Sequence, residues 1–225
     1  MRIPDKYKVI SIKAEYVKEW FLKKHYAKRI PSISYCFALQ DENNLTVGVC
    51  SFGTPASSTL LKGVCGVKFA DYVIELNRLI TNDNLKRNTC SFFLSQCLKK
   101  IPQPKIIVSY ADTSQNHNGY IYQATNFIYT GLSSRFLDPK VIGLEHLHHA
   151  TYANGLNNKE LKEKYGDKLY YQERARKHRY IYFLGNKSQV KLFKKELRYD
   201  IQEYPKGINR NYDASYNPSI QLNLL

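Results

Sequence analysis

The 225-residue chain has few or none of the features that mark several large protein classes. No apolar run approaches the roughly 18 residues that span a membrane, and no charged-then-apolar signal peptide opens the sequence. Neither an internal repeat nor a Pro/Gly/Ser-rich linker divides it. The odd set of five cysteines contains no Cys-x-x-Cys pair; its members are Cys36, Cys50, Cys65, Cys90 and Cys97. We therefore expect a cytoplasmic protein that does not enter a membrane, with five reduced and buried thiols.

Acidic residues are scarce as well. There are 19 Asp and Glu against 34 Lys and Arg, a formal net charge of +15. A charge of this size predicts attraction to a polyanion such as nucleic acid, an anionic membrane or a phosphorylated cofactor. The 19 Tyr and 10 Phe suit nucleic acid, because a ring can stack on a base while cations hold phosphates. The alternative is that Tyr fills strands and half-buried surfaces.

The hydrophobic pattern predicts a regular order of elements. A helix is expected over 11–26, followed by a hairpin with strands at 33–39 and 46–52. The later elements are expected as a strand over 72–79, a helix from Asn88 or Thr89, a strand over 105–110, a helix over 119–126, strands at 127–131 and 180–185, and a helix at 188–197. This order predicts one α/β (α+β) domain over residues 1–225, with a mixed central sheet flanked by helices and a basic C-terminal extension from about residue 170.

The middle of this order resembles the core of the GCN5-related N-acetyltransferase fold, in which a strand, a cofactor-binding helix, a strand and a second helix follow one another. The start of the expected cofactor helix has two cations, and helix N-termini bind phosphate. The candidates for cofactor binding are Lys86, Arg87, Asn88 and Thr89. The alternative is that Lys86 and Arg87 are solvated charges before a helix cap. The usual Gly-rich phosphate loop is missing, because no Gly occurs between residues 67 and 118.

The second helix carries Tyr122 in the segment YQATNF. Acetyltransferases often have Tyr-x-x-x-Gly-Phe at this place, and the Tyr protonates the leaving thiolate of coenzyme A. Asn126 replaces the Gly, and Asn tolerates left-handed backbone angles. Tyr122 is therefore a candidate general acid, with core packing as the alternative.

Polar residues follow two other elements in positions that suit a site. His25 continues the apolar line of Val17 and Phe21, so it is either a satisfied core residue or a ligand. Tyr26 comes next. Asp112 follows the central strand at its C-terminal end, where functional residues collect, and the alternative for it is a turn residue.

A cleft is expected where the central sheet splays. We expect the strands at 72–79 and 105–110 to belong to one sheet and to separate, opening a cleft lined by Glu75, Asn77 and residues 85–91. Strict alternation would place Glu75 and Asn77 on one face with Leu79, unusual company for a core strand.

The segment RARKHRYIYF, residues 174–183, is the densest basic stretch. Its cations are candidates for contact with the DNA backbone, namely Arg174, Arg176, Lys177 and Arg179. The alternative is an edge strand protected by charge. A second conspicuous stretch, EHLHH, lacks another Cys or His pair to complete a zinc site, so we expect its residues His146, His148 and His149 at the surface.

Five segments occur in an order and at spacings that together resemble the Mom family of phage DNA-modification proteins. They are HYAKRIPS, SFGTP, IELNRL, SYADTSQNHNGYIYQATNFIYTG and KHRYIYFLG. Each is short, but the ordered set is specific, and it spans residues 20–207.

The resemblance implies transfer of a methylcarbamoyl (acetamido-type) group to the exocyclic amine of adenine in double-stranded DNA, which blocks restriction endonucleases in the major groove. It implies bound iron held by His25, Tyr26, Asp112 and Tyr122, with Tyr122, Asp112 and Tyr26 catalytic, and acetyl-CoA or another acyl donor. The setting would be the bacterial host cytoplasm, and the oligomeric state is open, a dimer included. Two alternatives remain: an ordinary acetyltransferase on protein or small-molecule amines, and a non-catalytic DNA-binding anti-restriction protein.

Overall fold

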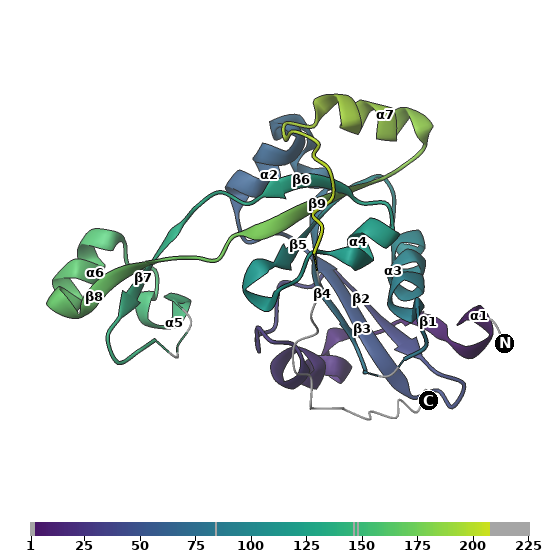
Figure 1. The fold of residues 1–225 in the computed structure, drawn as a ribbon, viewed down its shortest axis with the longest axis horizontal. Helices are drawn as coiled ribbons and strands as arrows, with labels where there is room; N and C mark the ends of the chain where they lie inside the picture. The colour runs from purple at the N-terminus through teal and green to yellow at the C-terminus, as the bar shows by residue number, and fades with distance from the viewer. Residues whose placement is uncertain (1–2, 84, 146, 148, 208–225) are drawn as a thin grey trace.

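A computed structural model describes residues 3–83, 85–145, 147 and 149–207 (Figure 1). Its main feature is a seven-stranded sheet in the order β1-β2-β3-β4-β5-β9-β6. The strands are β1 (Lys8–Ser11), β2 (Tyr35–Gln40), β3 (Thr46–Gly53), β4 (Val73–Thr81), β5 (Lys105–Asp112), β9 (Lys177–Leu184) and β6 (Ile128–Leu132). The β4–β5 pair is parallel, and the other pairs of this sheet are antiparallel. The expected mixed sheet is confirmed.

Helices cover both faces of this sheet (Figure 1). On one face, α3 (Thr89–Lys100) packs Phe93 and Leu94 into the largest core cluster, beside α4 (Tyr120–Ala124). On the other face lie α2 (Ser58–Cys65), a 3-10 turn η3 (Val67–Tyr72) and α7 (Lys187–Glu196). The succession β4, α3, β5, α4 confirms the expected order of strand, helix, strand and second helix.

The expected helix over 11–26 is wrong in its form. After the short α1 (Ile3–Lys6), β1 pairs with β2 as far as Ser11, so the chain is extended there. A 3-10 turn η1 (Ala14–Val17) and a π-helical turn η2 (Trp20–Lys24) follow. Val17 and Phe21 are both fully buried against the sheet, so the apolar spacing identified the buried face correctly. Sheet pairing and packing decided the backbone form.

The central sheet splays as expected, but the lining expected for its cleft is wrong: Lys86, Arg87, Asn88 and Ser91 line a groove along α3, whereas Glu75 faces the other side of the sheet and neither it nor Asn77 lines that groove. The β4–β5 ladder extends from Val73 opposite Ile106 to Leu76 opposite Ser109 and then ends. Beyond this point β4 continues along β3, and β5 continues along β9.

A bulge changes the faces of β4 at the same place. Ser51 of β3 pairs with Arg78 and the next residue pairs with Leu76, so Asn77 is an extra residue in β4. Leu76 and Leu79 therefore contact the same core cluster although they are three residues apart. The expectation that Leu79 shares a face with Glu75 is wrong, because the inserted residue breaks the strict alternation.

An arm, defined here as residues 137–173, projects from the sheet between β6 and β9 (Figure 1). It contains the antiparallel pair β7 (Leu137–Val141) and β8 (Leu169–Glu173), α5 (His149–Ala153), α6 (Asn158–Tyr165) and the 3-10 turn η5 (Gly166–Lys168). It has a hydrophobic cluster of its own, formed by Val141, Tyr152, Ala153, Leu161 and Leu169. These elements were not expected from the sequence, and the number of domains stays a prediction. His146 and His148 lie outside the described residues.

Two further expectations can be compared with the structure. All five cysteines are free; Cys90 is half-buried and the other four are buried. Among the described residues, no helix is long and apolar enough to cross a membrane.

Candidate active site

Asp112, the last residue of β5, is the centre of a polar contact network. Its Oδ1 accepts hydrogen bonds from the Ser114 backbone N–H at 3.0 Å and from Ser114 Oγ at 2.7 Å. Its Oδ2 lies 3.5 Å from Tyr26 Oη and 3.4 Å from Lys177 Nζ. Burial raises the pKa of Asp112, but the Ser114 hydrogen bonds and the Lys177 charge outweigh it and hold the pKa below its ordinary value. Asp112 is therefore an ionised carboxylate at neutral pH.

Tyr26 reaches this carboxylate from just after η2, and His25 packs against Tyr26. Their rings stack with centroids 4.4 Å apart, and His25 is 7% exposed. Burial, followed by the charges of Arg78, Lys177 and His117, lowers the pKa of His25 to about 3. His25 Nδ1 accepts the Ala27 N–H at 3.1 Å, so the neutral ring carries its proton on Nε2.

Glu75 of β4 belongs to the same region. Burial raises the pKa of its carboxylate, against the charges of Lys177, Arg78 and Arg29. Within the described part of the chain, no hydrogen bond or ion pair holds this carboxylate. Side chains alternate along each strand, so Glu75 and Asp112 share the sheet face on which α2 and α7 pack.

We call His25, Tyr26, Glu75, Asp112 and Lys177 the polar cluster. It lies where the apolar packing of this face divides into two groups, one under α2 and α7 and one under η1 and η2. Polar side chains that lie between two apolar clusters, beside the splay of the sheet, are groups to which a polar substrate can hydrogen-bond.

Tyr122 lies on the opposite face, with the α3 cluster. Its ring packs on Phe127 and Tyr180 at centroid distances of 5.4 and 5.1 Å. Burial raises the pKa of its hydroxyl, and the neighbouring Ser109 side chain lowers it in part. Ser109 Oγ in turn donates to the Leu76 carbonyl at 3.1 Å, in the last residue pair before β4 and β5 separate. The structure thus brings His25, Tyr26 and Asp112 together and places Tyr122 across the sheet, at the splay.

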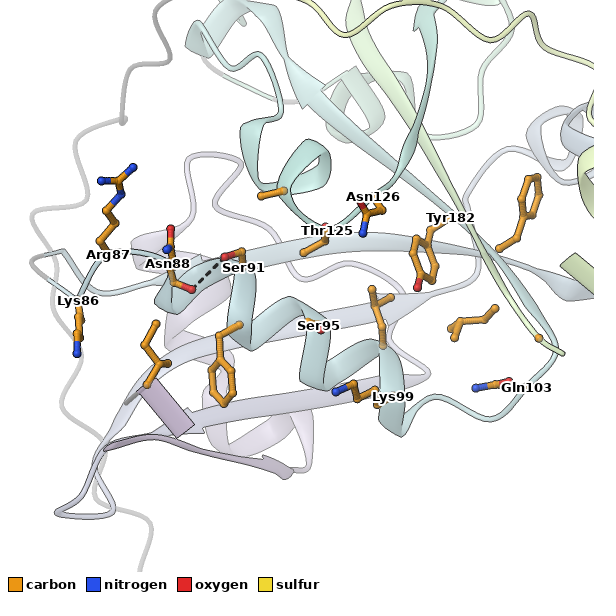
Figure 2. A pocket seen from close by; sticks show the side chains of 17 residues that line it. Lys86, Arg87, Asn88, Ser91, Ser95, Lys99, Gln103, Thr125, Asn126 and Tyr182 are labelled. Carbon is orange, nitrogen blue, oxygen red and sulfur yellow. Dashed lines mark hydrogen bonds between the residues drawn. The ribbon is translucent and has the colours of Figure 1, made fainter. Parts of the chain in front are cut away.

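A groove of about 960 Å³ runs along α3 (Figure 2). Three predicted cofactor-binding residues, Lys86, Arg87 and Asn88, line it at the N-terminal end of α3. The fourth, Thr89, is 1% exposed, and its Oγ1 has no hydrogen-bond partner among the described residues. Asn88 occupies the N-cap position with left-handed backbone angles. The groove therefore supplies space beside these residues, while cofactor binding itself stays a prediction.

The four cations predicted to contact DNA all have partners within the protein. Arg174 pairs with Asp138, Arg176 Nε donates to the Ser133 carbonyl at 2.6 Å, and Lys177 pairs with Asp112. Arg179 donates to Thr130 and stacks on the Tyr199 ring at 3.4 Å. The alternative of an edge strand is wrong, because β9 lies between β5 and β6. Contact between these cations and DNA stays a prediction.

The described residues do not fit the iron site that the resemblance implies. No three His, Cys, Asp or Glu side chains in the described ranges are placed to hold a metal ion. The Nδ1 lone pair of His25 is engaged by Ala27 and its Nε2 bears the proton, so the neutral ring has no lone pair for a metal. Tyr122 lies on the other face. No chemical step is therefore assigned to a metal.

Several site residues were not identified from the sequence. Ser109, beside Tyr122, donates a hydrogen bond to Leu76 where β4 and β5 separate. His117 lies edge-on to the Tyr26 ring, with ring centroids 6.3 Å apart. Ser114 was identifiable in principle, because Asp followed two residues later by Ser is typical of a turn in which the carboxylate accepts a backbone N–H. Lys177 was singled out, but for DNA contact rather than for Asp112.

Comparison with known proteins places the chain in a family. The chain is 28% identical over 130 residues to methylcarbamoylase mom of Escherichia phage Mu, and the match covers 54% of each protein, so the chain spans about half the length of this relative. Similar solved structures include ribosomal-protein-S5-alanine acetyltransferase from Vibrio fischeri, with TM-score 0.46 and 8% identity over 80% of this chain and 94% of that one. Another is N-acetyltransferase from Staphylococcus aureus Mu50, with TM-score 0.44 and 12% identity over 80% and 99%. Residues 6–206 match the Mom protein family, and the chain belongs to that family.

Proposed function

We propose that this protein transfers a methylcarbamoyl (acetamido-type) group to the exocyclic amine of adenine in duplex DNA, which shields phage DNA from restriction. Family membership and the phage Mu relative support the class of activity. The observation that carries the proposal is the contact of Tyr26 with Asp112 across 86 residues of sequence, beside Lys177 and at the splay of the sheet. Packing alone does not require a buried acid, phenol and cation at one point.

The polar cluster suits an amine as acceptor of the group. An exocyclic amine donates hydrogen bonds, and a carboxylate accepts them. We assign this role to Glu75, which has no hydrogen-bond partner among the described residues and whose raised pKa makes it a better base than an ordinary Glu. Asp112 stays ionised and orients Tyr26 and Lys177.

The opposite face suits the donor. Lys86, Arg87 and the N-terminus of α3 would hold phosphates of a donor in the groove. The group that this donor transfers must already carry the amide nitrogen of the product, because acetyl-CoA by itself would supply only an acetyl group. In the transfer, a bond forms between the amine nitrogen and the donor carbon, and the bond to the donor's leaving group breaks. The amine proton passes to Glu75, and Tyr122 gives its proton to the leaving group.

The test is expression in bacteria followed by mass spectrometry of plasmid nucleosides. We expect a modified adenosine with wild-type protein and none with Asp112→Asn. Plasmid that remains unmodified, although the protein is folded and soluble, overturns the proposal. So does a modification confined to another base.

A second candidate is acetyl transfer to a protein or small-molecule amine, because the groove along α3 has the cations that a coenzyme A pyrophosphate requires. It predicts acetylated amines and unmodified DNA in the same cells. The non-catalytic alternative predicts DNA that resists restriction without any modified nucleoside. The nucleoside measurement therefore separates all three.

A further inference from the structure

Two apolar side chains stand exposed at the root of the arm. Phe136 is 57% exposed and Leu137 is 58% exposed. They lie in the segment that leads from β6 into β7, opposite the return segment that leads from β8 into β9. Exposing a large ring and an aliphatic side chain next to each other costs hydrophobic free energy, so their position invites a functional explanation.

The Phe136 ring is held in place although it is exposed. The Arg174 guanidinium lies over it at 4.9 Å, and the Arg174 backbone N–H donates to the Phe136 carbonyl at 2.8 Å. Arg174 is itself fixed by Asp138, whose carboxylate accepts from both Nε and Nη2. A preorganised aromatic ring loses little conformational entropy when it inserts into a partner.

Ladder spacing and chain length place the Phe136 backbone within about 20 Å of Asp112 in the polar cluster. Asp112 is opposite Lys177 in the β5–β9 ladder, and the Ser133 backbone N–H donates to the Lys177 carbonyl at 2.8 Å. Ser133 is therefore two strand spacings, roughly 10 Å, from Asp112. Phe136 follows Ser133 by three residues, at most about 10 Å of extended chain. Figure 1 shows the arm leaving the sheet from the ends of β6 and β9.

The charge around Phe136 indicates the chemistry of its partner. Residues 132–136 and 174–179, the two segments of the root, contain five Lys and Arg and no Asp or Glu. The arm beyond them, residues 137–173, contains five Lys and six Asp or Glu. Three of these five cations pair with acids outside the root, namely Arg174 with Asp138, Arg135 with Glu173 and Lys177 with Asp112. Arg176 and Arg179 contact uncharged groups, so the root keeps a net positive charge. A partner that combines negative charge outside with stacked apolar rings inside is a nucleic acid duplex.

We propose that Phe136 and Leu137 are a wedge that enters the base stack of duplex DNA and fills the gap left when the target base is extruded toward the polar cluster. The proposal rests on the proposed function. A base that reacts inside a protein site must leave the helix, and apolar side chains that insert between base steps stabilise the distorted duplex. The wedge acts on the DNA and does not touch the reacting atoms, so Phe136 and Leu137 are positioning residues.

The test compares two DNA substrates for each variant. One is a fully paired duplex that contains a target adenine found in modified plasmids, and the other has the same adenine opposite an abasic site, where it is already unpaired. The variants are Phe136→Ala and Leu137→Ala. The matched control is Ile142→Ala, which is also 58% exposed but lies beyond the distal end of β7.

We expect Phe136→Ala to slow modification of the paired duplex by about 5- to 100-fold, the range that corresponds to removal of one stacking interaction. On the abasic duplex we expect a rate close to wild type, because little extrusion work remains. Ile142→Ala should leave both rates unchanged. A decrease of equal size on both substrates, or on neither, overturns the wedge.

Two further outcomes would also overturn it. If Phe136→Ala changes the molecular mass of the protein in solution, and the paired and abasic rates fall together, these side chains serve contact between copies of the chain. If wild-type protein modifies neither duplex, the proposed function is overturned, and the wedge proposal, which rests on it, is overturned as well. A wild-type protein that modifies both duplexes, with a Phe136→Ala variant of unchanged rate ratio, overturns the wedge alone.

Discussion

Asp112 Oδ2 and Lys177 Nζ lie 3.4 Å apart, on residues directly opposite each other in the β5–β9 ladder. The Asp112 side chain is 9% exposed and that of Lys177 39%. A buried carboxylate that keeps a low pKa requires such a partner, because burial alone would favour its neutral form. The densest basic segment of the sequence therefore supplies Lys177 to the polar cluster. This role is separate from the predicted contact of the segment with DNA.

Removing the Asp112 charge should abolish adenine modification while leaving DNA binding nearly intact. In Asp112→Asn, the side chain keeps its size, but Lys177 loses its ion pair and Tyr26 loses a charged acceptor. The modified fraction of plasmid adenosine measures the first effect, and a binding titration with duplex DNA measures the second. Glu19→Gln, which removes the acid of an exposed ion pair with Lys23, is the control. Normal modification by Asp112→Asn would contradict a role in the reaction.

Tyr122→Phe should reduce modification by at least about tenfold, because general acids contribute factors of this size or more. The ring keeps its packing on Phe127 and Tyr180, so the free energy of unfolding should change by less than about 1 kcal/mol. Tyr152→Phe is the matched control, since it removes the hydroxyl that donates to the Pro139 carbonyl in the arm. Equal activity in the two variants would assign Tyr122 to packing.

Arg176→Ala and Arg179→Ala should each lower the free energy of unfolding by about 1–3 kcal/mol, because they leave the acceptors of Ser133 and Thr130 without their donors. Arg135→Ala, whose side chain is 80% exposed in its ion pair, should change it by less than about 1 kcal/mol. Urea denaturation measures both.

The same two variants test the predicted binding of DNA phosphates. If these cations also bind phosphates, binding should weaken for all sequences alike, and the slope of log K against log salt should fall by about 0.9 for each phosphate that the variant no longer neutralises. Weaker binding to one sequence alone would contradict backbone recognition.

The protein should lose stability in alkaline solution. Burial raises the pKa of the Cys36 thiol to about 12 and that of Cys65 to about 11. In the unfolded chain these thiols ionise near their ordinary values, so above about pH 9 the folded state binds more protons than the unfolded state. The contribution of these two thiols to the free energy of unfolding is therefore fully present below about pH 9. It declines as the pH rises through the folded pKa, by at most about 1.4 kcal/mol per pH unit for each thiol. Urea midpoints at about pH 8 and about pH 10 should differ, and Cys36→Ala should reduce the difference. A difference of the same size in Cys36→Ala would contradict this account.

Much of the sheet could be predicted from local patterns. The hairpin of β2 and β3 follows two apolar runs around Asp41–Asn44, and α3 follows from Phe93, Leu94 and Cys97 at helical spacing. The segment KIIVSY indicated a strand buried on both faces, and β5 is that strand. These features are determined within short stretches of chain, where periodicity alone reports which side is buried.

The polar cluster could be predicted only in part. His25, Tyr26, Asp112 and Tyr122 were expected to converge on one site. The structure puts Tyr26 in contact with Asp112 and His25 against Tyr26, because the inward line of Val17 and Phe21 and the C-terminal end of a central strand lead to one edge. The role of these residues stays a prediction. The place of Tyr122 across the sheet could not be foreseen, because the face a helix covers depends on the crossover and not on its own sequence.

Sequence alone therefore determined the buried stripes, the succession β4, α3, β5, α4, the positive charge and the family resemblance. Tertiary structure decided three features. The bulge at Asn77 reversed the faces of the second half of β4, because it depends on the register with β3. The pairing of Asp112 with Lys177 depends on a ladder between segments that lie far apart in the chain. The arm, whose cluster unites Val141, Tyr152 and Leu169, has no single periodic segment long enough to reveal it, because its core exists only after its short elements pack together.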